Sequence, residues 1–318
     1  MNNFSKSVLF SAVATAFSAN NALADSHYSF ELVTYPGAEN TSIFGLNDRG
    51  FAVGPSDGGN FSYSLKSGGI SDLEIGDLED AAVLATSDSG HYAGVWDDAE
   101  NEWRLSFYMD KKGKVTTFEH PDALDVTNAR AMNNNGLITG YFSVEKSTPF
   151  AYVAADGFIY DVKKGTFETI VPSMFTIAQG INNDGIVVGS ARFWPEEDPC
   201  IDAFPQYTMM GWVRNKGGDV TYFTINGMPT RARGISDSDT VVGFAFDPSD
   251  NTNKGFVIDI PEGQCVTVEV DSADMMAAPD ALATYPQAIK NSGEIVGSAV
   301  VIDGQGELAQ VGFVARKQ

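Results

Sequence analysis

The chain has 318 residues and carries 42 acidic side chains against 20 Lys and Arg, so its formal net charge is −22. Nucleic acids and anionic lipid headgroups are bound by basic residues that displace counterions, so this charge argues against partners of either kind. With 3 His and 2 Cys, a zinc site would need nearly every candidate ligand, and no CxxC or HExxH spacing occurs. The composition, with 43% apolar residues, 32 Gly and 13 Pro, is typical of a globular protein built from strands and turns.

The first 24 residues differ from the rest of the chain. Lys6 precedes a mostly apolar run from Val8 to Phe17, and Ala22-Leu23-Ala24 has the small-x-small pattern of a signal-peptidase site. This run is shorter than the roughly 20 residues that a membrane-spanning helix needs. We therefore predict a cleaved signal peptide at residues 1–24 and a secreted or periplasmic mature chain at residues 25–318, with a net charge of −23. The alternative is a retained anchor, and no membrane insertion is expected after cleavage.

A short motif recurs along the predicted mature chain. It consists of a small residue, an apolar residue, a polar turn that mostly ends in Gly, and a closing Gly four residues later. The copies occupy residues 45–54, 85–94, 131–140, 180–189, 234–243 and 288–297. Successive closing glycines are 40 to 54 residues apart, a spacing that suits one four-stranded blade of a β-propeller per copy.

The motif also predicts the strands within each unit. Its Asn, Asp and Gly residues are hairpin-turn chemistry, because Asn and Asp bond their own backbone and Gly accepts a positive φ. After the second strand and a variable loop, we expect a third strand marked by an aromatic residue: Phe61, Phe107, Phe150, Trp212, Phe256 and Phe313. Fourth strands are expected at 115–118, 220–223 and 266–268.

The two ends of the chain are expected to share one unit. The last unit stops after its third strand, and segment 29–35 precedes the first motif as fourth strands precede the others. Pairing of the two ends would close a ring and remove the exposed edges that invite aggregation. We therefore predict an all-β fold, a six-bladed β-propeller of four-stranded blades closed by the N-terminal strand, and a monomer.

The repeated sequence resembles a known family. Gly-Ile-Asn-x-x-Gly-x-x-Val-Gly, followed by a strand of the Gly-Phe-Val type, is similar to the HAF-repeat family of bacterial extracellular β-propeller proteins, and the resemblance covers nearly all of the mature chain. The His-Ala-Phe triplet itself is absent, with Pro149-Phe150-Ala151 and Lys254-Gly255-Phe256 among the sequences in its place. The resemblance implies an exported repeat domain and brings no activity with it.

One face of the predicted propeller is the better candidate for binding. Loops after the second and fourth strands share one face, here named the loop face, and the hairpin turns share the opposite turn face. The turns are short and regular, whereas the loops vary and include a long stretch from 192 to 210. Irregular loops on a rigid scaffold commonly carry binding sites, so we expect any site on the loop face.

Four consecutive inner strands carry a polar residue three positions before the turn: Arg130, Gln179, Arg233 and Gln287. The first two units carry Phe44 and Leu84 there. Strand alternation directs these positions to the loop-face mouth of a central channel. One interpretation is an arc that binds an anion, because guanidinium groups match carboxylate or sulfate. The other is that these side chains satisfy buried carbonyls or a neighbouring Asp where the blades converge.

His120 is the candidate for acid–base catalysis. It lies in a predicted loop-face segment upstream of Arg130, and a His–Arg pair could serve β-elimination on an acidic polysaccharide. His120 would be the base, and Arg130 or Arg233 would neutralise the uronate. The alternative is a loop His that caps a backbone group, since no partner acid or Tyr is fixed by spacing.

Acidic loops offer a calcium candidate. Asp247, Asp250, Asn251 and Asn253 supply clustered oxygen atoms of the kind that Ca²⁺ prefers, and Asp97, Asp98 and Glu100 form a second cluster. The spacing matches no EF-hand loop, and solvated acidic loops are the alternative. No other cofactor is expected.

The two cysteines and the absent motifs complete the prediction. Cys200 and Cys265 are expected to form a disulfide if the chain is exported, although they fall in adjacent units and at nominally opposite ends of the sheets. No Gly-x-Ser-x-Gly, P-loop or dinucleotide motif occurs. We predict non-catalytic recognition of an anionic glycan or a partner protein through the loop face. The alternatives are an acidic-polysaccharide lyase or hydrolase and a secreted structural module.

Overall fold

A computed structural model describes residues 27–78, 80–144, 154–171, 173–205 and 208–318 of the protein. The regular elements of these residues are β-strands, so the predicted all-β class is confirmed. No helix in this part of the chain is long and apolar enough to cross a membrane. The predicted signal peptide at residues 1–24 lies outside the described residues.

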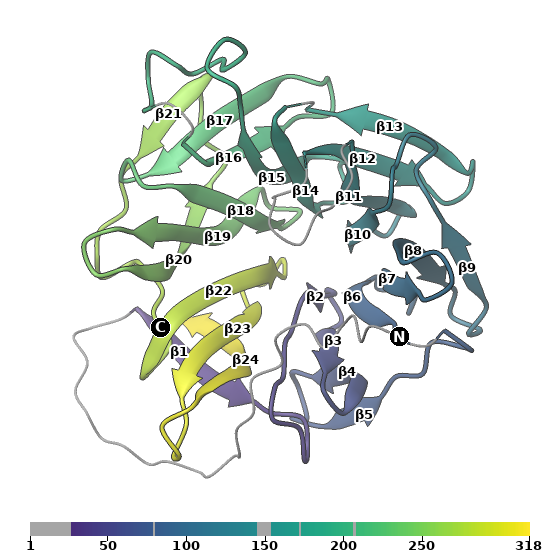
Figure 1. Cartoon of the computed structure of the whole chain (residues 1–318). Helices are drawn as coiled ribbons and strands as arrows, with labels where there is room; N and C mark the ends of the chain where they lie inside the picture. Colours follow the sequence, from purple (N-terminus) through teal and green to yellow (C-terminus); the bar gives the residue numbers. More distant parts are fainter. Residues whose placement is uncertain (1–26, 79, 145–153, 172, 206–207) are drawn as a thin grey trace.

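The strands form antiparallel units that follow one another around a common centre (Figure 1). The first unit contains, in spatial order, β2 (Gly45–Leu46), β3 (Phe51–Ser56), β4 (Gly59–Ser64) and β5 (Ile70–Asp72). The second contains β6 (Ala82–Thr86), β7 (Tyr92–Asp98), β8 (Trp103–Met109) and β9 (Val115–Phe118). The third contains β10 (Thr127–Met132), β11 (Leu137–Ser143), β12 (Ala155–Asp161) and β13 (Thr166–Ile170).

The later units continue this pattern with one exchange of strands. The fourth orders β14 (Phe175–Ile181), β15 (Val187–Arg192), β16 (Met210–Arg214), β17 (Val220–Ile225) and β21 (Cys265–Val268). The fifth pairs β18 (Thr230–Ile235), β19 (Thr240–Asp247) and β20 (Thr252–Asp259). The last orders β22 (Ala281–Ile289), β23 (Ile295–Ile302), β24 (Leu308–Lys317) and β1 (Tyr28–Val33). Single backbone bridges link the third unit to the fourth and the fifth to the last.

The closing glycine of each motif lies beneath a buried aromatic ring. Gly140 pairs with Phe158, and a β-carbon at Gly140 would lie 2.0 Å from the carbonyl oxygen of Asn128 and 2.7 Å from Phe158 Cζ, so only Gly fits between the inner strand and the ring. The predicted aromatic residues pair with their glycines in the same way: Phe61, Phe107, Trp212, Phe256 and Phe313. In the third unit, Phe158 of β12 occupies this position, and the expected Phe150 lies outside the described residues.

The small residue that opens each motif lets the inner strands approach one another. A β-carbon at Gly180 of β14 would lie 3.0 Å from the Cα atom of Gly234 on β18. Gly or Ala therefore lies where the inner strands converge, and the core forms farther out between neighbouring units. Trp212 and Phe223 are fully buried there.

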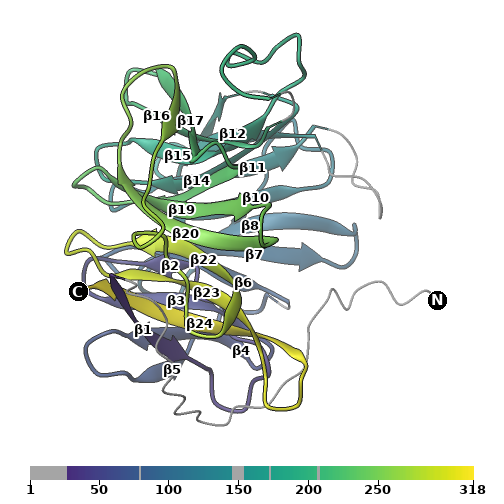
Figure 2. The same ribbon diagram turned by 90° about the vertical axis from the view of Figure 1, so that its left-hand side faces the viewer.

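The first and last strands pair along their length. Tyr28 to Val33 of β1 pair antiparallel with Lys317 to Gly312 of β24, and both views show the two strands side by side (Figure 2). Glu31 on β1 adds two side-chain bonds. It accepts from Tyr63 Oη at 2.5 Å and from Arg316 Nη1 at 3.2 Å. These contacts tie the described N-terminal residues to both the last and the first units.

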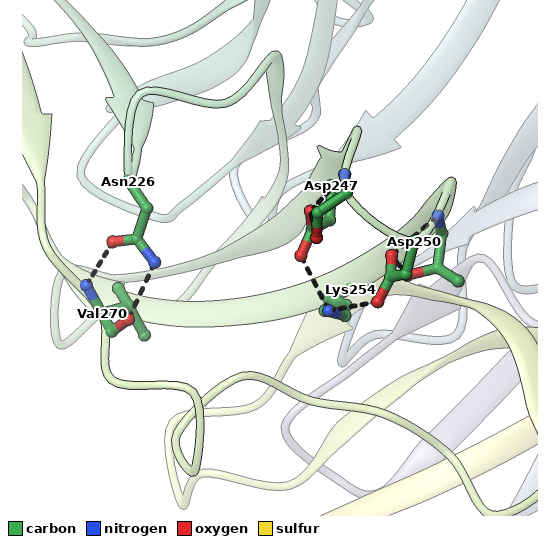
Figure 3. Close-up of polar contacts among 7 residues, drawn as sticks. Asn226, Asp247, Asp250, Lys254 and Val270 are labelled. Atoms are coloured by element: carbon green, nitrogen blue, oxygen red, sulfur yellow. Dashed lines mark hydrogen bonds and ion pairs between the residues drawn. The ribbon is translucent and has the colours of Figure 1, made fainter.

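The predicted fourth strand at 266–268 belongs to a different unit. β21 pairs in parallel with β17, with Tyr222 opposite Cys265, instead of completing the sheet of β18 to β20. Beyond β21, the side chain of Asn226 bonds both backbone groups of Val270 at 2.7 and 2.8 Å (Figure 3). The unit assignment from sequence is therefore wrong here, because the chain after β20 crosses to the free edge of the preceding unit.

This exchange brings the two cysteines together. Cys200 and Cys265 form a disulfide with a Cα–Cα distance of 5.7 Å, so the predicted bond is confirmed. The sequence register placed them at opposite ends of adjacent sheets. Because β21 lies on the outer edge of the fourth unit, Cys265 reaches the long loop of that same unit.

Candidate functional site

The polar arc lies on bulges of the inner strands. The ladder of β10 and β11 shifts register between Ala129 and Ala131, so Arg130 is an extra residue without a partner on β11. Matching shifts occur at Leu84, Gln179, Arg233 and Gln287. A bulge disrupts the local ladder and redirects a side chain. The sequence predicted the positions of these residues but not the bulges.

These residues line a cavity at the loop-face end of the centre, with about 420 Å³ of empty space that includes open solvent. Arg130, Gln179, Arg233 and Gln287 all border it, and Phe44 and Leu84 complete its rim. The sequence therefore identified residues that the fold does bring together, although they are far apart in the chain.

The two arginines of this cavity lack acidic partners among the described residues. Arg130 and Arg233 form no ion pair with any carboxylate in the described part of the chain. Burial lowers the pKa of Arg130, and burial followed by the charges of Arg130 and Arg231 lowers the pKa of Arg233. Guanidinium groups nevertheless stay charged in proteins. The loop-face end of the centre is thus cationic within an acidic protein.

A layer of mostly apolar side chains forms the floor of this cavity. Each inner strand contributes one residue two positions after the arc: Leu46, Thr86, Met132, Ile181, Ile235 and Ile289. The same residues border a second cavity of about 380 Å³ at the turn-face end. The layer therefore separates a loop-face half of the centre from a turn-face half.

The turn-face half is ringed by a cycle of hydrogen bonds. In each step, a backbone N–H donates to a side-chain oxygen of the next motif copy at 2.7–2.9 Å. The cycle runs from Asp48 to Asp88, Asn134, Asn183, Asp237 and Asn291 and returns to Asp48. Burial, followed by the charges of Asp88 and Asp237, raises the pKa of Asp48. This end is anionic, opposite to the loop-face end.

Two neighbouring motif positions both contact the next motif copy. The side-chain oxygen of Asn182 accepts from the backbone N–H of Ile186 at 2.9 Å within its own hairpin, as the sequence predicts, and its amide donates to Ser236 O at 3.2 Å. The following residue, Asn183, accepts from Asn134 and donates to Asp237. Sequence reasoning assigned both positions to the hairpin and missed these contacts between units. Recurrence of Asp or Asn at the second position was the available signal.

His120 lies in an aromatic cluster. Its side chain is 2% exposed and stacks on Phe142 with ring centroids 3.6 Å apart. Nδ1 accepts from the backbone N–H of Asp122 at 3.2 Å, and Nε2 lies 3.4 Å from Thr169 Oγ1. Burial lowers the pKa of His120, against the opposing effect of Asp122. His120 borders neither of the two cavities, and a catalytic role for it remains an untested hypothesis.

The calcium candidate in the β19–β20 hairpin holds a lysine. Lys254 Nζ lies 2.8 Å from Asp247 and 2.6 Å from Asp250, between the two carboxylates (Figure 3). The hydrogen bond from Lys254, followed by those from Ser249, lowers the pKa of Asp247 well below its usual range. Asn251 occupies the turn at a φ of 58°, and the amide of Asn253 donates to Tyr285.

The second acidic cluster is also engaged by other groups. Asp97 pairs with Arg104 at 2.7 Å, and Asp98 accepts from Asn101 and from the backbone of Glu100. No cluster of three or more His, Cys, Asp or Glu side chains suited to a metal ion occurs in the described ranges. We propose no calcium site at either cluster.

Comparison with known proteins assigns the chain to a family. Residues 39–198 match the family described as "Protein of unknown function (DUF3466)". The chain belongs to the DUF3466 family. The DUF3466 match spans the first four motif copies and contains Arg130 and Gln179, whereas Arg233 and Gln287 lie beyond it. Membership of the HAF-repeat family remains an expectation.

The structure is similar in outline to several solved structures. The match to U3-55K covers 90% of this chain and 98% of U3-55K at 11% identity, with a TM-score of 0.47. The match to virginiamycin B lyase from Staphylococcus aureus covers 89% of this chain and 88% of the lyase at 13% identity, with a TM-score of 0.42. The match to a mutant of AofleA from Arthrobotrys oligospora covers 89% of this chain and 86% of AofleA at 10% identity, with a TM-score of 0.43. No curated protein sequence is significantly similar to the chain.

Proposed function

We propose that the protein is an exported, non-catalytic recognition protein that binds a glycan or a partner protein through its loop face. The observation that carries this proposal is the loop-face cavity, where the guanidinium groups of Arg130 and Arg233 lack a carboxylate partner among the described residues. Both arginines are half-buried, and even partial desolvation of a charge without a partner is costly. A ligand with negative charge would supply the partner.

The proposed scaffold is a six-bladed propeller of residues 25–318, closed by the N-terminal strand. The pairing of β1 with β24 supports closure, as does the hydrogen-bond cycle, in which Asn291 of the last motif donates to Asp48 of the first. In this scaffold, the fourth blade contains β21 as an added outer strand. We further propose a monomer that follows a cleaved signal peptide at residues 1–24. The Cys200–Cys265 disulfide supports an oxidising compartment.

Exposed apolar side chains also lie at the loop-face ends of the strands. These residues are 39–55% exposed and lie in interstrand connections or at their edges: Leu124, Trp194, Leu282, Ile302 and Leu308. They come from separate units, and at the turn-face end of β3 Phe51 is exposed as well.

A glycan array tests the proposal. Wild-type protein should bind a subset of acidic glycans, and Arg233→Ala should abolish that binding while its circular dichroism spectrum stays unchanged. Arg214→Ala is the matched control, because Arg214 pairs with Glu168 and does not border the cavity. Unchanged binding by Arg233→Ala would remove the arc from the proposal.

The lyase alternative has less support because His120 is buried against Phe142. Its test is the ultraviolet absorbance of an unsaturated sugar when polyuronates are incubated with the protein. Formation of that product, and its loss in His120→Ala, would replace the non-catalytic proposal.

A further inference from the structure

Resting on the proposed function, we infer that the loop-face cavity binds the carboxylate of a terminal sugar acid, with Arg130 and Arg233 as its ligands. The anionic group enters from the loop face, and the rest of the glycan stays outside the cavity.

Three residues that border the cavity carry buried, unpaired donors. Arg130 Nε, Arg233 Nε and Gln179 Nε2 are buried and have no hydrogen-bond acceptor among the described residues. Gln179 is only 5% exposed, and it borders the cavity together with both arginines. Buried N–H groups without acceptors are rare in native proteins, because each costs its full desolvation free energy. One anionic group in the cavity would offer acceptors to donors of all three residues.

Aromatic rings hold both guanidinium groups in place. Arg130 lies over the Phe44 ring at 5.9 Å and Arg233 over the Phe244 ring at 5.1 Å. A ring against the face of a guanidinium leaves its N–H edges available, which is the geometry in which arginine binds a carboxylate. Arg233 Nη1 also donates to Gln179 Oε1 at 2.9 Å, which leaves the amide nitrogen of Gln179 for a ligand.

The charges favour a single carboxylate. A carboxylate has two oxygens that can accept hydrogen bonds from the planar N–H edges of two guanidinium groups, which a spherical anion matches less well. The chain as a whole has a net charge of −22, so it repels a ligand more strongly as the negative charge of the ligand increases. A monoanion can therefore bind the two arginines with the least repulsion from the acidic protein.

The floor of the cavity favours an end group. Met132, Ile181 and their counterparts separate the cavity from the turn-face half, and Asp48, Asp88 and Asp237 lie in that second half. A carboxylate that passed the apolar layer would meet like charges, so an anionic chain cannot thread through the centre. Gln287 also borders the cavity. Its amide can both donate and accept hydrogen bonds, which suits a hydroxylated ligand body.

Isothermal titration calorimetry of the exported chain with sodium glucuronate tests the inference. Glucuronate should bind, whereas glucose and glucuronate methyl ester should not, since they have the same body without the charge. Arg130→Gln and Arg233→Gln should each weaken binding by about tenfold or more, because each removes a charge-assisted contact. Arg214→Gln should bind as the wild type does.

Other ligands identify which part of the inference fails. Equal binding of sulfate would overturn the choice of carboxylate, and tighter binding of a peptide C-terminus would overturn the sugar. Oligosaccharides with only internal uronates that bind as tightly as those with a terminal uronate would overturn the end-group geometry.

Absence of heat with millimolar glucuronate, or binding retained in both Arg variants with native circular dichroism spectra, would overturn the inference as a whole. If array glycans without carboxylates still bind in an Arg233-dependent way, the proposed function stands without this inference. If the array also shows no binding, the inference fails together with the glycan form of the proposed function.

Discussion

Asn291 and Asp48 are joined by two hydrogen bonds although 243 residues separate them in the chain. The backbone N–H of Asn291 donates to Oδ1 of Asp48 at 2.9 Å, and its side-chain amide donates to Oδ2 at 2.7 Å. The last motif copy thereby contacts the first at the turn face. Closure of the hydrogen-bond cycle depends on this pair.

Asn291→Ala should lower the free energy of unfolding by about 1–3 kcal/mol, measured by urea denaturation. The substitution removes the amide bonds to the carboxylates of Asp48 and Asp237 and leaves the backbone N–H of Asp237 without its acceptor. Asn101→Ala is the control, because the side chain of Asn101 bonds only Asp98, three residues away in the same unit, and takes no part in the cycle. Equal losses in the two variants would show that the cycle contributes no particular stability.

Arg130→Met should raise the free energy of unfolding of the ligand-free protein by about 1–2 kcal/mol. It removes a charge that has no acidic partner among the described residues and keeps an unbranched side chain near Phe44. Arg214→Met, which breaks the pair with Glu168, should instead have no effect or a small loss. Loss of stability in Arg130→Met would mean that internal groups satisfy the guanidinium, and the structural interpretation of the arc would then hold.

His120 should make the protein less stable in mild acid. Burial lowers its folded-state pKa below the ordinary value of 6.5, so the unfolded chain binds the proton first as pH falls. Stability should therefore decrease from about pH 6.5 downward until the folded-state pKa is reached, and this penalty should be absent above that range. In urea titrations at several pH values, His120→Gln should flatten this slope relative to the wild type. If His120→Gln leaves the slope unchanged, other groups cause the acid sensitivity.

The double substitution Cys200→Ala with Cys265→Ala should cost roughly 2–5 kcal/mol of stability. The disulfide spans 65 residues of sequence, and its loss removes a constraint on the unfolded chain. Hydrogen exchange should also become faster in β21, whose outer-edge position the bond reinforces. If β21 stays as protected as in the wild type, its parallel pairing with β17 suffices to hold it.

The sequence predicted much of the fold because each motif residue has a local physical reason. Gly140 must accommodate an aromatic ring, and Asn182 bonds within its own hairpin. Both requirements recur at fixed spacing, so the sequence reveals them. The third strand of the third unit could not be predicted in this way, because Phe150 and Phe158 both follow a plausible loop and only pairing with Gly140 distinguishes them.

Features that depend on distant contacts could not be predicted. Segment 266–268 has an ordinary strand sequence, and nothing local indicates that it pairs with β17 instead of β20. The candidate site was partly predictable, since alternation identified Arg130 and Arg233. The lack of acidic partners in the described ranges, the apolar floor and the burial of His120 all arise from how separate units pack. One motif copy does not encode that packing.

The bulges give the arc positions an unusual freedom. Because Leu84, Arg130, Gln179, Arg233 and Gln287 are the unpaired residues of their strands, their side chains can change without the loss of a ladder partner. The residues at these positions can therefore vary while the strands that carry them stay the same. Substitutions along it should alter ligand preference while the strands keep their registers, which makes this cavity a practical starting point for engineering new specificities.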